Sequence, residues 1–246
     1  MIFSDKGTIE NRVPPKRHKP LIFHVRRLLR PKSITIHGIR LCCDPKLVGR
    51  REMRRLFRGN HENAEVYALR HTLEADDRVL ELGAGVGLTS IFASRIVGPE
   101  NITVFEANEA NRPLIEKNYA LNGVSIPVHY KMVTHEGGKK PFFVSDKAVS
   151  SGPVEASGAT KKIELDSVAI SDLIADYSPT YLICDIEGGE IEVLQGDLGS
   201  IRKICVEVHP AKVGNYAVTG LMKTLIDQGF TLAAEISNGT NQFWFR

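Results

Sequence analysis

The chain has 246 residues, of which 42% are hydrophobic and 25% are charged, a composition typical of one sizeable domain with an appendage. No apolar stretch reaches the roughly 18 residues that a membrane-spanning helix needs, and the polar N-terminus lacks the hydrophobic core of a signal peptide. These features predict a cytoplasmic protein. The four cysteines show no zinc-ligand spacing, so we expect reduced, structural thiols at Cys42, Cys43, Cys184 and Cys205.

Charge is distributed unevenly along the chain. Residues 1–58 contain 16 Lys and Arg but four acidic residues, a net of +12, whereas residues 59–246 contain 16 Lys and Arg and 25 acidic residues, a net of −9. This contrast predicts a basic N-terminal extension over residues 1–60 and an acidic domain over residues 61–246.

Within the extension, the segment between Pro20 and Pro31 predicts a short amphipathic helix. Such a helix can touch a membrane surface, an acidic partner or nucleic acid, or it can fold onto the acidic domain. A peripheral membrane or nucleic-acid contact through residues 12–58 is therefore one expectation, and packing on the domain is the other. Residues 33–41 predict a β-hairpin that turns at His37-Gly38. In the helix predicted between Pro20 and Pro31, an apolar stripe lies opposite a basic face. The stripe comprises Leu21, Ile22, Val25, Leu28 and Leu29, and the basic face comprises His24, Arg26, Arg27 and Arg30.

From residue 61 onward, predicted helices and strands alternate, which indicates a parallel sheet. Asn238-Gly239 near the C-terminus predicts a hairpin between residues 231–236 and 242–245. An α/β, Rossmann-like fold is therefore expected, with a seven-stranded, mostly parallel sheet and an antiparallel C-terminal hairpin, the architecture of class I methyltransferases. After a helix marked by Val66, Leu69 and Leu73, the expected elements are strand 78–82, helix 86–97, strand 102–106, helix 109–122, strand 126–133, a Gly-, Lys- and Ser-rich excursion over 134–160, strand 161–165, helix 169–177, strand 180–185, a short helix near 189–198, strand 203–208 and a helix around 218–226.

The segment from Val79 to Gly87 joins a buried strand to a helix through three closely spaced glycines. Their G-x-G-x-G spacing differs from the G-x-G-x-x-G of a dinucleotide-binding turn. An acid before the first glycine suits a ligand that carries a cation, such as the sulfonium and α-amino groups of S-adenosylmethionine. Glu106 ends the next predicted strand, where an acid in doubly wound folds accepts hydrogen bonds from ribose hydroxyls. An ordinary strand–helix turn and a solvated acid are the structural alternatives. The predicted cofactor site comprises Glu81, Gly83, Gly85, Gly87 and Glu106.

A second group of ionisable residues follows two later strands. One predicted strand ends in Asp185 and Glu187, and the next ends in Glu207 and His209. Because ligands bind outside the carboxyl ends of parallel strands, these side chains should face the same crevice as the glycines. For Glu187 or Glu190, capping of the helix that follows is an alternative role.

Several segments resemble the FkbM family of S-adenosylmethionine-dependent methyltransferases, over roughly residues 62–210. Two departures stand out: Ile183 occupies a position where the family often has Lys, and Ala107 one where it usually has Pro. The resemblance implies O-methylation of a hydroxyl on a sugar, polysaccharide or secondary metabolite, with a small-molecule or carbohydrate acceptor that can be anionic. The matching segments are Leu-Gly-Ala-Gly-Val-Gly (82–87), Phe-Glu-Ala-Asn (105–108), Leu-Ile-Glu-Lys-Asn-Tyr-Ala-Leu-Asn-Gly (114–123), Leu-Asp-Ser-Val (165–168), Asp-Ile-Glu-Gly-Gly-Glu (185–190) and Val-Glu-Val-His (206–209).

Transfer to a hydroxyl needs alignment of oxygen, carbon and sulfur and a base for the hydroxyl proton. We expect His209 to be this base near neutral pH, with Glu207 orienting its ring. Asp185 would orient the acceptor or the cofactor amine, or act as the base itself. The predicted catalytic group is therefore Asp185, Glu187 and His209, without a metal. In the alternative scheme, Asp185 and Glu187 hold Mg²⁺.

Three other classes of function stay open. An RNA methyltransferase would use the basic extension for phosphate contacts, although only 7% of the residues are aromatic. A noncatalytic binding protein on a methyltransferase scaffold is disfavoured because Glu81, Glu106 and Asp185 are all present. A nicotinamide oxidoreductase is disfavoured by the glycine spacing and the terminal hairpin.

Overall fold

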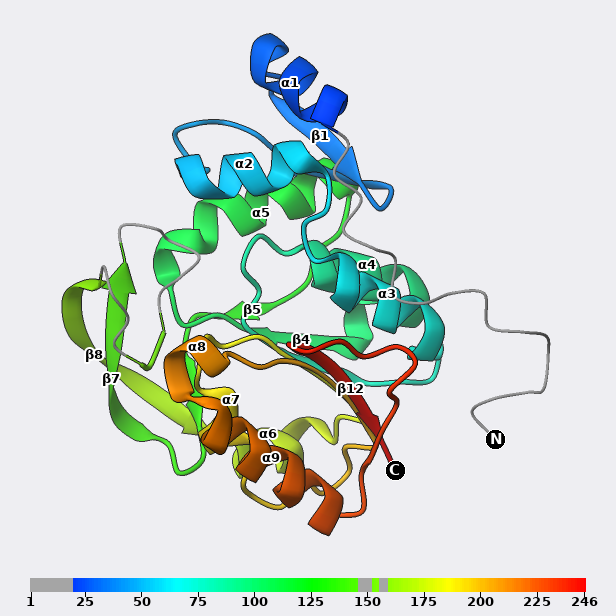
Figure 1. Ribbon diagram of the computed structural model, residues 1–246, viewed down its shortest axis with the longest axis vertical. Coiled ribbons are helices and arrows are strands. Elements are labelled where there is room, and N and C mark those ends of the chain that lie inside the picture. The colour runs from blue at the N-terminus through cyan, green and yellow to red at the C-terminus, as the bar shows by residue number, and fades with distance from the viewer. Residues whose placement is uncertain (1–19, 146–151, 155–158) are drawn as a thin grey trace.

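The computed structural model describes residues 20–145, 152–154 and 159–246. At its centre lies a seven-stranded sheet in the order β11-β12-β10-β9-β3-β4-β5, with helices on both faces (Figure 1). The five strands from β10 to β5 are parallel, and β12 runs antiparallel to both β10 and β11. The predicted Rossmann-like sheet with its C-terminal hairpin is therefore confirmed. In chain order the strands are β3 (Val79–Leu82), β4 (Ile102–Phe105), β5 (Val128–His129), β9 (Tyr181–Cys184), β10 (Lys203–Glu207), β11 (Thr231–Leu232) and β12 (Asn241–Phe245).

The central strands are buried on both faces, as parallel strands covered by helices must be. In β3, Val79 packs into one hydrophobic core and Leu80 into a second core on the opposite face. The first core contains residues of α3 (Asn63–Thr72), α4 (Leu88–Val97) and α5 (Arg112–Asn122). The second core contains residues of α6 (Ile170–Tyr177), α7 (Glu190–Val193) and α9 (Asn215–Asp227). Three short helices lie between these elements in the sequence: η1 (Pro99–Asn101), η2 (Glu109–Asn111) and α8 (Pro210–Val213).

The N-terminal part of the described chain contains the predicted helix and hairpin. These are α1 (Pro20–Leu29), β1 (Ser33–Ile36) and β2 (Ile39–Cys42), and they are followed by α2 (Arg50–Arg58), which the sequence analysis did not predict. The hairpin turns at His37-Gly38, where both residues have a positive φ, as a two-residue turn between twisted strands requires. Its inward-facing side chains are fully buried in the same core as α3, α4 and α5. Residues 12–19 of the predicted contact segment lie outside the described residues.

A smaller, three-stranded sheet contains β6 (Met132–Thr134), β7 (Gly138–Ser145) and β8 (Ala159–Ala169). The prediction of a single strand over residues 126–133 is wrong, because this segment contains β5 and β6, which belong to different sheets. The chain turns between them, where the backbone N–H of Lys131 donates to the carbonyl of His129. The strand predicted over 161–165 is part of the longer β8, which pairs with β7 in the predicted excursion. Residues 146–151 and 155–158 of that excursion lie outside the described residues.

The four cysteines are buried and free, as predicted. Within the described parts of the chain, no helix has the length and apolar character needed to cross a membrane.

Candidate functional site

The winding of the main sheet reverses between β3 and β9. From β3 the chain steps outward through β4 to β5, and it then returns to β9 and β10 on the other side of β3. Open α/β sheets bind ligands at the carboxyl ends of the strands beside such a switch point. Gly83 and Asp185 follow β3 and β9 directly, so the switch point brings the glycine loop and the second acidic segment to one place.

Gly83 is required by the close approach of these two strand ends. The backbone N–H of Asp185 donates to the carbonyl of Leu82 at 2.9 Å, and that of Gly83 donates to the carbonyl of Phe105 at 2.8 Å. Any β-carbon on Gly83 would collide with the carbonyl oxygen of Asp185. The glycine therefore has a structural role, whatever it contributes to ligand binding.

Gly85 and Gly87 have different surroundings, although both have a positive φ. A β-carbon on Gly87 would lie 2.8 Å from Cε1 of Tyr119, so the ring packs against that glycine. A β-carbon on Gly85 would meet only Oε1 of Glu62, at 3.7 Å. The space beside Gly85 is therefore open, and a ligand can approach the loop there.

Glu106 lies at the end of β4, beside the same loop. Its Oε2 atom accepts the backbone N–H of Gly85 at 3.1 Å, and Oε1 accepts the N–H of Asn108 at 2.8 Å. Burial raises the pKa of this carboxyl group, and the backbone donors oppose that shift. The side chain of Asn111 and the backbone of Ala84 also interact with this carboxyl group, so a ribose hydroxyl would share its oxygens with these donors.

Glu81 is fully buried in β3, beneath the glycine loop. The hydroxyl of Thr89 donates to Oε1, whereas Oε2 has no hydrogen-bond partner among the described residues. Burial raises the pKa of Glu81 to about 8, and the nearby charges of Glu62 and Glu106 act in the same direction. A cationic ligand above the loop would favour the ionised form of this carboxyl group.

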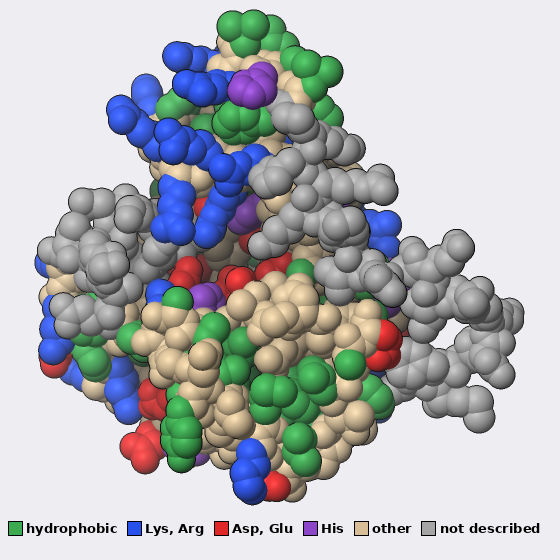
Figure 2. Space-filling view, in the orientation of Figure 1, with side chains coloured by type: hydrophobic (Ala, Val, Ile, Leu, Met, Phe, Trp, Pro, Cys, Tyr) green, Lys and Arg blue, Asp and Glu red, His purple; other side chains and the backbone are tan. Residues whose placement is uncertain are grey.

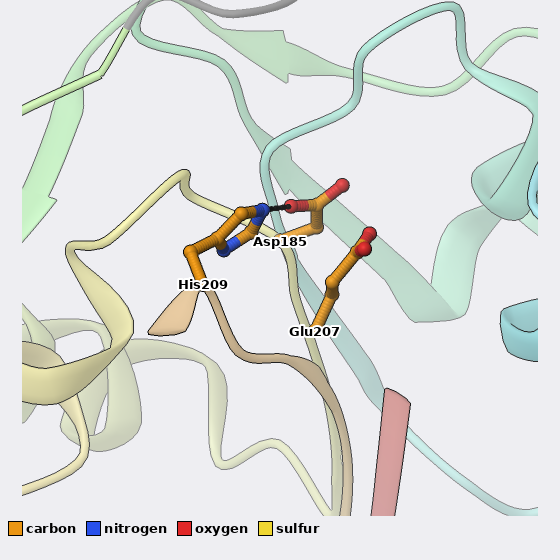
Figure 3. Close-up of side chains that lie close together, drawn as sticks. All are labelled: Asp185, Glu207 and His209. Atoms are coloured by element: carbon orange, nitrogen blue, oxygen red, sulfur yellow. Dashed lines mark ion pairs between the residues drawn. The ribbon is translucent and has the colours of Figure 1, made fainter. Parts of the chain in front are cut away.

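The predicted catalytic residues converge at the ends of the adjacent strands β9 and β10. Nε2 of His209 lies 3.5 Å from Oδ1 of Asp185 and 3.5 Å from Oε2 of Glu187. Figure 3 shows His209 and Asp185 pointing toward one another, with the carboxylate of Glu207 beside them. Oδ1 of Asp185 has no hydrogen-bond partner in the described structure, so it can accept a bond from a ligand.

The position that we predicted for Glu207, orienting the ring of His209, is occupied by Glu190. Oε1 of Glu190 lies 3.2 Å from Nδ1 of His209 and accepts its backbone N–H at 2.9 Å. Oε2 of Glu190 accepts the N–H of Gly188 at 2.7 Å, which anchors the carboxylate at the start of α7. Burial by itself would lower the pKa of His209, but Glu190 and Glu187 raise it overall.

The site as a whole is strongly acidic. The pKa of Asp185 is raised well above its usual value by burial and then by the charges of Glu207 and Glu187, although 38% of its side chain is exposed. Glu65 on α3 has its pKa raised to about 8, by burial and by Glu207. Figure 2 shows acidic side chains gathered in a hollow, with Lys and Arg side chains above it around α1 and α2.

Lys212 on α8 supplies a cation inside this acidic group. Its Nζ atom lies 2.7 Å from Oε2 of Glu187, and only 13% of its side chain is exposed. This chain has Ile183 where the resembling family often has a lysine near Asp185. A lysine from another element of the fold therefore lies beside the same carboxylates.

Asp185, Glu207 and His209 also form a set of three possible metal ligands. Each offers one atom, and these atoms lie within 4.8 Å of one another. Carboxylate oxygens suit Mg²⁺, and a mixed set with imidazole suits transition metals as well. In this geometry a metal ion would be held by Asp185, Glu207 and His209, whereas the alternative scheme from the sequence used Asp185 and Glu187 as its ligands.

Sequence reasoning missed three residues of this site. Glu62 precedes a helix in an ordinary polar run, and Lys212 lies in a short helix that was not predicted. Glu190 was considered only as a helix cap. Glu62 and Lys212 carry no local signal, because each reaches the site through the packing of distant segments, whereas Glu190 lies in the matching segment 185–190 and could have been found there.

The sheet topology and the glycine loop at its switch point are those of a class I methyltransferase. A model of the methyltransferase FkbM domain matches residues 81–232, and the chain belongs to this family. The predicted resemblance is therefore confirmed. A search of curated proteins gave no match.

Solved structures of methyltransferases are similar to this chain at low sequence identity. TYW2 from M. jannaschii, in complex with AdoMet, has a TM-score of 0.47 and 12% identity over 87% of this chain and 85% of that one. A precorrin-6y C5,15-methyltransferase from Geobacter metallireducens GS-15 has a TM-score of 0.39 and 17% identity over 78% of this chain and 77% of that one. Fibrillarin from Aeropyrum pernix, in complex with natively bound S-adenosyl-L-methionine, has a TM-score of 0.40 and 12% identity over 74% of this chain and 72% of that one. The identification rests on the family model.

Proposed function

We propose that this protein is an S-adenosylmethionine-dependent O-methyltransferase that acts on a hydroxyl of a sugar, a polysaccharide or a secondary metabolite. One observation carries the proposal. The imidazole of His209 and the carboxylate of Asp185 lie 3.5 Å apart at the same strand ends as an open glycine loop. A base and a hydroxyl-binding group therefore adjoin the place where a nucleoside cofactor fits.

The residues around the glycine loop fit the cofactor. Gly85 leaves the space that its close approach needs, and Glu106 offers acceptor oxygens to the ribose hydroxyls. Glu81 lies below the loop, and a ligand with a sulfonium and an ammonium group would favour its ionised form. The cofactor supplies a methyl group on a positively charged sulfur, which is an electrophile that a hydroxyl oxygen can attack.

The residues at the ends of β9 and β10 prepare the hydroxyl. Nε2 of His209 takes the hydroxyl proton, while Glu190 holds the ring through Nδ1 and stabilises the imidazolium that forms. Asp185 accepts a hydrogen bond from the acceptor and fixes its position. A positioned base typically contributes about 10²–10⁴-fold, and alignment of the reacting atoms contributes roughly 7–11 kcal/mol in favourable systems.

A basic rim around the acidic hollow supports an anionic acceptor or an anionic surface as the partner. Leu21, Leu28 and Leu29 on α1 are 76%, 83% and 72% exposed. The contact between α1 and α2 is made by Arg26 rather than by these leucines. Its guanidinium donates to the carbonyls of Leu56 and Phe57. We favour a peripheral contact with an anionic membrane, because nucleic acid offers little to an exposed stripe of leucines whereas a lipid interface buries it.

Methyl transfer can be followed with S-adenosylmethionine that carries a deuterated methyl group. Cell extracts incubated with the protein and this cofactor should yield a product that is heavier by one labelled methyl, and fragmentation should place the label on oxygen. A label on nitrogen or carbon would contradict O-methylation. Absence of cofactor binding in calorimetry would contradict the proposal as a whole.

The same assay separates the base from the metal alternative. With His209 as the base, dialysis against EDTA should leave the rate unchanged. If EDTA abolishes the rate and Mg²⁺ or Mn²⁺ restores it, then Asp185, Glu207 and His209 are metal ligands, and the proton must be taken in another way.

A further inference from the structure

Glu62 lies beside the glycine loop in a backbone conformation that few residues adopt. Its φ of 49° and ψ of 34° place it in the left-handed region, at the N-cap of α3. A residue other than glycine is uncommon there, and such conformations cluster at ligand sites, where the surrounding structure holds them. Only 16% of the Glu62 side chain is exposed. The fold therefore holds a carboxylate in a fixed place next to Gly85.

A buried imidazole pairs with this carboxylate. Nε2 of His61 lies 2.9 Å from Oε1 of Glu62, and Nδ1 lies 3.2 Å from Oε1 of Glu52 on α2. Burial by itself would lower the pKa of His61, but the charges of Glu62 and Glu52 raise it to about 9. The ring is therefore protonated near neutral pH and paired on both sides.

The second carboxylate oxygen of Glu62 is not the one that His61 contacts. Oε2 is buried and has no hydrogen-bond partner in the part of the chain that the structure describes. Leaving a buried carboxylate oxygen without a donor is costly, so the arrangement is complete only with a donor from outside the described residues. The Oε1 atom of the same carboxylate lies 3.7 Å from the point that a β-carbon on Gly85 would occupy. A ligand that enters over the loop can supply this donor.

The charge of Glu62 also reaches both halves of the site. It raises the pKa of Glu81 below the loop and, more weakly than nearer acids, that of Asp185 at the end of β9. Glu62, Glu81 and Asp185 are thus near enough to interact electrostatically, so the space that a ligand would occupy among them is acidic. A cation with several N–H donors satisfies such a space better than a hydroxyl, because each donor can pair with a charged acceptor.

We propose that Glu62 binds the α-ammonium group of the cofactor's amino-acid portion and that His61 and Glu52 position it. This inference rests on the proposed cofactor. It extends the cofactor site to the segment before α3 and ties α2, in the basic N-terminal part, to cofactor binding. Glu62 is then a binding residue, and His61 and Glu52 are positioning residues.

Two ligands without a transferable methyl group test the proposal by calorimetry. S-adenosylhomocysteine has the ammonium group, whereas 5′-methylthioadenosine keeps the nucleoside and the thioether but lacks the amino-acid portion. Glu62→Gln should weaken binding of S-adenosylhomocysteine about 10- to 100-fold, as expected for a lost charge-assisted hydrogen bond. Its affinity for 5′-methylthioadenosine should be unchanged. His61→Gln should show the same selectivity with a smaller effect.

Glu109→Gln is the control, because it also removes one negative charge, from a side chain that is 72% exposed and paired with Arg112. It should change neither affinity. Equal weakening of both ligands in Glu62→Gln would overturn the proposal, since a ribose contact or a folding defect affects both. Unchanged affinity for both ligands would overturn it as well and would assign Glu62 to the acceptor. If the wild-type protein binds neither ligand, the proposed cofactor itself is wrong.

Discussion

Nδ1 of His209 lies 3.2 Å from Oε1 of Glu190, a carboxylate that is fully buried. The pair joins the end of β10 to the start of α7 and leaves Nε2 of His209 directed at Asp185. The proposed base thus has one nitrogen fixed by Glu190, and the other lies beside the carboxylates where we propose that the acceptor binds. Negative charge on Glu190 favours the protonated ring and raises its pKa.

The first prediction concerns the pH dependence of turnover. A base must be neutral, so the rate should rise with pH through the pKa of His209. Glu190→Gln removes a charge that raises this pKa, and the rise should therefore move to lower pH. Profiles of kcat/KM for the wild type and the variant check this. His209→Ala should lower kcat about 10²–10⁴-fold and abolish the rise. An unshifted profile in Glu190→Gln would contradict the role of the pair.

Two substitutions in the glycine loop should affect different properties, one the stability of the fold and the other the binding of the cofactor. Gly83→Ala places a β-carbon against the carbonyl of Asp185, so it should lower the melting temperature strongly. Gly85→Val meets open space on the protein side, so it should fold with a modest loss of stability from its positive φ. It should nevertheless lose cofactor binding, because the side chain fills the space above the loop. Calorimetry and thermal melts of both variants measure the two effects, and normal cofactor binding by Gly85→Val would contradict the site.

Glu106 should contribute to cofactor affinity through the ribose. Glu106→Ala should weaken binding of S-adenosylhomocysteine by about 1–3 kcal/mol, the cost of leaving hydroxyl groups without their acceptor. Binding of 5′-methylthioadenosine should weaken equally, because that ligand keeps the ribose. An effect confined to S-adenosylhomocysteine would place Glu106 at the amino-acid portion instead.

Stability should fall as the pH rises from about 6.5 to 9. The pKa of Glu81 is raised from 4.5 to about 8, so the folded state keeps a proton that the unfolded state has released, and rising pH favours unfolding. The pKa of His61 is raised from 6.5 to about 9, so its stabilising charge is present below 6.5 and is lost as the pH rises through 9. Both groups act in one direction. Thermal melts across this range should show the decline, and Glu81→Gln should make it smaller. A flat curve would contradict both shifts.

The exposed stripe of α1 should control membrane binding without affecting stability. Replacing Leu21, Leu28 and Leu29 by Ser should abolish sedimentation with vesicles that contain phosphatidylserine, while the melting temperature stays the same because these side chains are exposed. Arg26→Ala should act differently and lower the melting temperature, because its guanidinium donates to two carbonyls of α2. Vesicle binding that survives the triple substitution, or binding to RNA that depends on the same leucines, would contradict the membrane contact.

The sequence by itself determined the features that depend on local pattern. Alternating apolar strands and helices specify a parallel sheet, because strands buried on both faces and amphipathic helices have different periods. The glycine loop, Glu106, Asp185 and His209 could be placed at one edge of that sheet because all of them follow strands that run in the same direction. The C-terminal hairpin was predicted from Asn238-Gly239, but the connection is longer than that dipeptide, because β11 ends at Leu232 and β12 begins at Asn241, and neither Asn238 nor Gly239 has a positive φ.

Only the tertiary structure decided which of these groups touch and which face outward. Glu190 pairs with His209 in place of the expected Glu207 because a turn at Gly188-Gly189 folds α7 back over the end of β10. Glu62 meets Gly85, and Lys212 meets Glu187, because segments distant in sequence pack side by side. The stripe on α1 is exposed because Phe23 and Arg26 make the contacts with the body. Periodicity specifies the faces of an element, but the partner of each face is chosen by the packing of the whole chain.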